Sequence, residues 1–154
     1  MTSEARAAVN VPVQIGDDHY LIGPGFHDGY LEGIALGGGE ARLTLRCIHD
    51  GVHELTLHGL RHLLMNEFRE GNIISEIRIV TGAEPDRDML EALVYGQPHP
   101  SVPEIFQQRH RDGLNKMVEE VLAGVTNLVI LGPCAGAELL ALCTSVSLRK
   151  LEVS

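Results

Sequence analysis

The stretch from residue 41 to residue 58 constrains the fold more than any other part of the chain, because apolar and polar side chains alternate along it. The apolar positions are Ala41, Leu43, Leu45 and Cys47 in the first half, and Leu55 and Leu57 in the second. A period of two puts these side chains on one face of an extended chain and the intervening polar side chains on the other. The pattern predicts two half-buried strands joined near Asp50 and Gly51.

The length of the connecting loop decides which side chains face each other. A two-residue loop at Asp50 and Gly51 would set Leu45 opposite Thr56, an apolar side chain against a polar one. A three-residue loop over 49–51 sets Leu45 opposite Leu55 and gives Gly51 the third loop position, where a left-handed backbone is required. Because a slip of one residue turns every side chain to the other face, we expect the three-residue loop. The pairs it predicts are Cys47 with His53, Leu45 with Leu55 and Leu43 with Leu57.

The rest of the chain predicts more strands, interrupted once by helices. Extended segments bounded by turns lie at 19–22, 26–36, 73–80, 127–131, 137–143 and 146–151. Gly33 marks a bulge in the second of them. Apolar residues at helical spacing predict helices over 86–94 and about 101–122, the second capped by Ser101. The segment 60–70 fits either a short helix or an irregular strand.

These elements predict an α+β fold, a mostly antiparallel β-sandwich or curled sheet with a two-helix insertion. The length of 154 residues is typical of one domain. We expect residues 1–12 to form a loose N-terminal arm. Residues 13–154 are then a single β-rich domain whose helical insertion spans about 85–123.

Charge and cysteine content narrow the function classes. Lys and Arg total 12 against 21 Asp and Glu, a formal net charge of −9, which disfavours nucleic acid as a partner because nucleic-acid binders present a basic surface. Three cysteines without close spacing predict a cytoplasmic protein with no disulfide framework, and the N-terminal residues show no signal peptide. The apolar run 127–146 contains Glu138 and a Gly-Pro turn, so two buried strands explain it better than a membrane span.

Eight histidines raise the question of a metal site. His49 and His53 have a spacing that aligns ligands on a helix, and His58 and His62 have the same spacing. The first pair lies on the predicted hairpin, however, and a zinc site needs three or four converging ligands. We expect surface or core histidines and neither a metal nor a cofactor.

His27 and Asp28 follow a Gly-Pro-Gly bend at the start of a predicted strand. A carboxylate beside an imidazole orients the ring or raises its pKa, so one interpretation is a general base or a recognition site. The other interpretation is a structural pair at the sheet edge, with the two side chains on opposite faces of the strand. We retain His27 and Asp28 as candidate binding residues.

Cys134 lies in the sequence Gly-Pro-Cys-Ala-Gly after an apolar segment. If a helix began at Ala135, the thiol would lie near its N-terminus, where thiolates are stabilised. The leucines that follow are equally compatible with a strand, which would make this segment a β-turn. The GxSxG, HExxH and CxxC motifs are all absent from the sequence, so Cys134 is the candidate nucleophile only if the first alternative holds.

Two short motifs resemble a loose group of small bacterial β-rich proteins. Residues 26–31 read Phe-His-Asp-Gly-Tyr-Leu, and residues 136–143 read Gly-Ala-Glu-Leu-Leu-Ala-Leu-Cys. Members of the group open with F-H-D-x-x-L and close with G-A-x-x-x-A-L-C, and some are similar to immunity proteins of polymorphic toxin systems. The resemblance covers about 26–80 and 126–150. It implies a non-enzymatic domain and supplies no catalytic residues.

Two functions follow as expectations. The first is a cytoplasmic, non-enzymatic binding or immunity-like domain that contacts a protein partner or another copy of itself, with neither nucleic acid nor membrane involved. An acidic surface suits a basic partner such as a nuclease toxin. The alternative is a small cysteine-dependent hydrolase or thiol enzyme that uses Cys134 with a histidine brought close by the fold.

Overall fold

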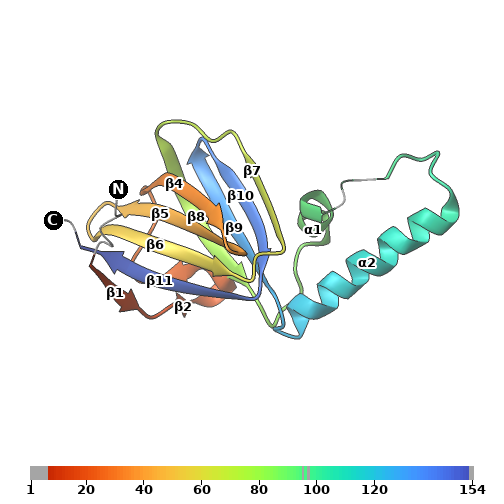
Figure 1. The fold of residues 1–154 in the computed structure, drawn as a ribbon, viewed down its shortest axis with the longest axis horizontal. Coiled ribbons are helices and arrows are strands. Elements are labelled where there is room, and N and C mark those ends of the chain that lie inside the picture. The colour runs from red at the N-terminus through yellow and green to blue at the C-terminus, as the bar shows by residue number, and fades with distance from the viewer. Residues whose placement is uncertain (1–6, 95, 97, 153–154) are drawn as a thin grey trace.

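The main sheet has nine strands, and every neighbouring pair is antiparallel (Figure 1). The computed structural model describes residues 7–94, 96 and 98–152. The strands of this sheet are β1 (Ala8–Val11), β4 (Tyr30–Gly37), β5 (Glu40–Cys47), β6 (Gly51–His58), β7 (His62–Asn66), β8 (Asn72–Val80), β9 (Asn127–Ala135), β10 (Glu138–Cys143) and β11 (Ser145–Leu151). Their order across the sheet is β1-β11-β6-β5-β4-β8-β9-β10-β7. Two short strands, β2 (Gln14–Ile15) and β3 (Leu21–Ile22), pair separately on either side of the 3-10 helix η1 (Asp17–His19).

Two helices, α1 (Arg87–Val94) and α2 (Glu104–Leu122), occupy the connection between β8 and β9. The predicted α+β fold, an antiparallel sheet with a two-helix insertion, is therefore confirmed. In Figure 1, α1 lies between the sheet and α2, and α2 extends away from the sheet. Neither helix in the described part of the chain has the length and apolar content that a membrane crossing requires.

The β5–β6 hairpin has the predicted faces but a different register. Cys47 pairs with Gly51 and Leu43 with Leu55, so the loop is residues 48–50, not 49–51. The three-residue length was predicted correctly, and the pairing of Leu45 with Leu55 was wrong because Leu45 faces His53. The two registers differ by two residues and bury the same side chains, so hydrophobic alternation does not distinguish them. Gly51, with φ +71°, closes the loop in a conformation that favours glycine.

The apolar core lies on both sides of the sheet. One cluster joins side chains of β4, β5, β6, β8, β9, β10 and β11, and all four hairpin leucines belong to it. A second cluster joins the opposite face of β9 and β10 to the two helices; its members include Leu90, Leu114, Val118, Val121, Leu128, Ile130, Leu140 and Leu142. The runs 128–131 and 139–143 are continuously apolar because these parts of β9 and β10 are buried on both faces.

Four local expectations have clear outcomes. The loose arm is wrong for residues 8–11, which form β1 by pairing with β11; residues 1–6 of that arm lie outside the described residues. The segment 60–70, for which the sequence allowed a helix or a strand, contains the strand β7. The bulge at Gly33 is confirmed by a register shift between Leu31 and Gly33. Ser101 does not cap α2, because α2 begins at Glu104 with Pro103 at the N-cap position; the Ser101 hydroxyl is hydrogen-bonded to His99 Nδ1 at 2.6 Å.

Candidate functional site

His27 and Asp28 form a pair in the turn before β4. His27 Nδ1 lies 2.7 Å from the carbonyl oxygen of Ser75 on β8, and His27 Nε2 lies 3.5 Å from Asp28 Oδ2. The expectation that the two side chains face opposite sides is wrong, because Asp28 has φ +61° and is in a turn instead of a strand. Both side chains are mostly exposed, 69% and 57%. The imidazole is thus tied to the backbone of β8 beside a small slot of about 190 Å³.

Cys134 is exposed near the end of β9. The chain continues as a strand through Ala135, turns, and returns as β10, so the alternative of a helix starting at Ala135 is wrong. Among the described residues, none of the hydrogen bonds brings a histidine to the Cys134 thiol. In the described part of the chain, the Cys134 thiol therefore lacks the imidazole hydrogen bond that the thiol-enzyme hypothesis requires.

A different cysteine lies beside a histidine, in the core near the tip of the β5–β6 hairpin. Cys47 Sγ is 3.6 Å from His53 Nδ1, and His53 Nε2 is 3.5 Å from Asp50 Oδ2, without hydrogen-bond geometry. The Lys150 ammonium lies 2.7 Å from Asp50 Oδ1. The ring of Phe26 meets the imidazole edge-on, with 5.9 Å between ring centroids.

Burial sets the protonation of this thiol–imidazole pair. It raises the pKa of the Cys47 thiol to about 11 and lowers the pKa of the His53 imidazole. Both groups are therefore neutral near pH 7, whereas a nucleophilic cysteine needs its thiolate. The arrangement is that of a packed core contact.

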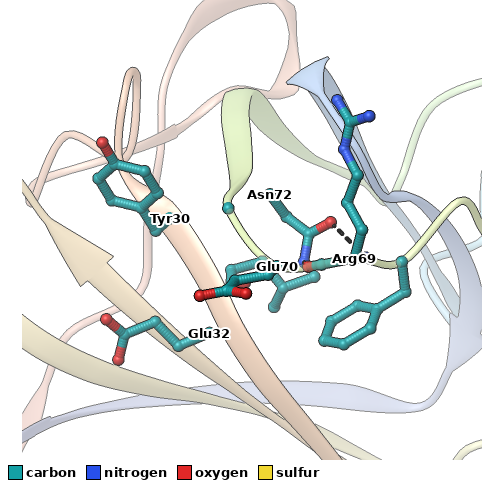
Figure 2. Close-up of a pocket in the computed structure, with 8 residues that line it drawn as sticks. Tyr30, Glu32, Arg69, Glu70 and Asn72 are labelled. Carbon is teal, nitrogen blue, oxygen red and sulfur yellow. Dashed lines mark hydrogen bonds between the residues drawn. The ribbon is translucent and has the colours of Figure 1, made fainter.

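An open cleft lies between β4 and the turn that joins β7 to β8 (Figure 2). It has a volume of about 320 Å³, at the low end of the range for small-ligand sites. Its lining consists of Tyr30, Leu31, Glu32, Phe68, Arg69, Glu70, Gly71 and Asn72. The two sides lie next to each other because Leu31 on β4 pairs with Asn72 at the start of β8.

Asn72 is the buried side chain that holds this cleft in shape. Its Nδ2 donates to the carbonyl oxygens of Leu31 and Arg69, at 3.3 and 2.5 Å. Its Oδ1 accepts from the backbone N–H groups of Arg69 and Ala137, both at 3.0 Å. One amide side chain thus connects the β7–β8 turn, β4 and the β9–β10 turn. Buried polar networks that are fully satisfied favour one conformation.

Gly136 provides the space that this network needs. Its φ is +84°, and a Cβ built on it would lie 2.4 Å from Asn72 Oδ1. A side chain at position 136 would therefore displace the Asn72 amide. Position 136 therefore requires glycine, because its φ is positive and because a Cβ would clash with Asn72.

The charges of the cleft are unequally compensated. The Arg46 guanidinium donates to both carboxylate oxygens of Glu32, through Nε and Nη2. The Glu70 carboxylate, by contrast, takes part in none of the hydrogen bonds and ion pairs formed by the described residues. In Figure 2 it points toward the side of the cleft where Tyr30 and Glu32 lie, and the Arg69 guanidinium points away.

Two aromatic rings add an apolar surface to this charge. Tyr30 is 41% exposed and Phe68 is 45% exposed, although rings of this size are usually buried. An aromatic face and a carboxylate both attract a cation, the first through its quadrupole and the second through its charge. The lining therefore suits a positively charged group with an apolar stem.

Sequence reasoning missed this cleft. The pattern leaves the segment 60–70 open between a short helix and an irregular strand, and it places Tyr30 in the predicted strand 26–36. The local signal in residues 68–72 was an aromatic residue and charges beside a Gly-Asn turn, which is typical of many surface turns. Within the described parts of the chain, no group of three or more His, Cys, Asp or Glu side chains is placed to hold a metal ion.

No protein-family model, no curated protein and no solved structure significantly matches this chain.

Proposed function

We propose that this protein is a cytoplasmic binding domain that docks a basic segment of a protein partner in the cleft between β4 and the β7–β8 turn. The observation that carries the proposal is the uncompensated Glu70 carboxylate, which shares the cleft with the exposed rings of Tyr30 and Phe68. The site lies on a turn fixed by Asn72. A preformed site lowers the entropy cost of binding.

The overall charge supports a basic partner. A net charge of −9 attracts a positively charged protein over a distance of about one Debye length and raises the rate of encounter. The resemblance to small bacterial proteins of the immunity type agrees with this role, because an immunity protein acts by binding. A basic nuclease toxin is a partner of the appropriate charge.

The thiol groups favour binding over the cysteine-dependent alternative. The exposed thiol, Cys134, is not held beside an imidazole in the described residues, and the thiol that does contact an imidazole, Cys47, is buried and has a raised pKa. In the part of the chain that the structure describes, neither thiol therefore has the activated imidazole partner that nucleophilic catalysis needs, and a binding role fits these residues better.

Fluorescence anisotropy of a short labelled peptide of alternating arginine, lysine and glycine tests this proposal on the full chain. We expect binding that weakens with salt, and Glu70→Gln should reduce the affinity about threefold to fivefold. The matched control is Glu119→Gln on α2, which removes the same charge from an exposed position outside the cleft and should change the affinity less than about twofold. Equal losses from both variants would mean that only net charge matters, and they would overturn the assignment of the cleft.

A further inference from the structure

We propose that the cleft selects an arginine side chain of its partner over a lysine. This inference rests on the proposed function, since it concerns the ligand of the same site. Three features of the cleft carry it: the exposed aromatic rings, the free carboxylate of Glu70, and the placement of Arg46 and Arg69, which leaves that carboxylate uncompensated.

The aromatic rings distinguish the two cations. A guanidinium is planar, delocalised and weakly hydrated, so it stacks on a ring face and loses little water on doing so. A lysine ammonium is a compact, strongly hydrated charge that gains less from the same surface. Both sides of the cleft carry an aromatic ring: Tyr30 on β4 and Phe68 on the β7–β8 turn. A planar cation in the cleft can therefore stack on the ring of Tyr30 or on the ring of Phe68.

The carboxylate adds a second criterion. A guanidinium binds a carboxylate through two parallel N–H···O contacts, and an ammonium acts as a point charge. The chain already shows this geometry at the cleft, where Arg46 contacts both oxygens of Glu32 through Nε and Nη2. Glu32 is thereby compensated, and Glu70 is the carboxylate that remains for an incoming guanidinium.

Neither of the two arginines beside the cleft compensates Glu70. Arg69 lines the cleft, but its backbone N–H and carbonyl are both bound to Asn72 and its guanidinium points away from Glu70 (Figure 2). Arg46 is committed to Glu32. The volume of about 320 Å³ suits one long side chain better than a large cofactor.

Two labelled peptides of equal length and charge, one with arginine and glycine and one with lysine and glycine, test the selection by anisotropy. We expect the arginine peptide to bind about fivefold more tightly, the size of a cation–π contact at a partly exposed site. Phe68→Leu should reduce this preference to about twofold or less. The control is Phe106→Leu on α2, an exposed ring outside the cleft at 52% exposure, which should leave the preference unchanged.

The outcomes separate this inference from the proposal on which it rests. If both peptides bind equally and Glu70→Gln weakens both, arginine selection is refuted and the basic docking site stands. If neither peptide binds, both are refuted. An arginine preference that survives Phe68→Leu combined with Tyr30→Leu would overturn the stacking argument. Urea unfolding of each variant identifies any loss of affinity that comes from loss of folding.

Discussion

Replacing Asn72 with alanine should destabilise the fold and loosen the cleft at the same time. The substitution removes four hydrogen bonds that one amide makes to Leu31, Arg69 and Ala137. The contacts to Leu31 and Ala137 are buried, whereas the two to Arg69 are partly exposed and open to replacement by water. The cost should therefore come mainly from the two buried contacts.

The expected magnitude follows from those two contacts. Loss of the bond to the Leu31 carbonyl costs about 0.5–1.5 kcal/mol, and the buried Ala137 N–H left without a partner costs about 1–3 kcal/mol. We therefore expect Asn72→Ala to lower the free energy of unfolding by about 2–4 kcal/mol. For a chain of this length that corresponds to a fall in Tm of about 4–16 °C.

Urea unfolding followed by far-ultraviolet circular dichroism measures this change, since the chain has no tryptophan to report by fluorescence. The control is Asn66→Ala, which removes the same amide from an exposed position on β7 and should cost less than about 0.5 kcal/mol. Anisotropy should also show weaker peptide binding by Asn72→Ala, because the turn that holds Phe68 and Glu70 is no longer tied to β4. If Asn72→Ala were as stable as Asn66→Ala, the claim that this amide holds the cleft would be refuted.

Three further outcomes follow from the structure. Gly136→Ala should cost about 1–3 kcal/mol through backbone strain and its contact with Asn72, and less in the Asn72→Ala background; equal costs in both backgrounds would contradict the contact. Burial lowers the pKa of His53 in the folded state, so the unfolded chain binds the proton first and stability should fall as pH drops below about 6.5, by at most about 1.4 kcal/mol per pH unit. Denaturant unfolding at several pH values measures how the free energy of unfolding depends on pH, and this dependence should be weaker in His53→Leu. An unchanged dependence would mean that other groups cause it. In the native protein Cys134 alone should react rapidly with a chromogenic disulfide reagent, because the other two cysteines are buried; rapid reaction of a second thiol would show that the core opens readily.

The alternating leucines determined the sidedness of the β5–β6 hairpin from sequence alone. A period of two allows one buried face, and Leu43, Leu45, Leu55 and Leu57 are fully buried on it. Apolar runs and helical spacing likewise predicted the strands at 73–80, 127–131 and 137–143 and the two helices between 80 and 127, so the α+β class was predictable. These properties depend on neighbours along the chain, which a sequence displays directly.

The tertiary structure decided everything that depends on contacts between distant segments. It set the hairpin register, which the leucine pattern leaves open, and it turned residues 8–11 into a strand by pairing them with β11 at the far end of the chain. The cleft has the same origin, since Asn72 reaches residues 41 and 65 positions away. A side chain whose partners lie that far along the chain has no local pattern, because its role is fixed only when the strands pair.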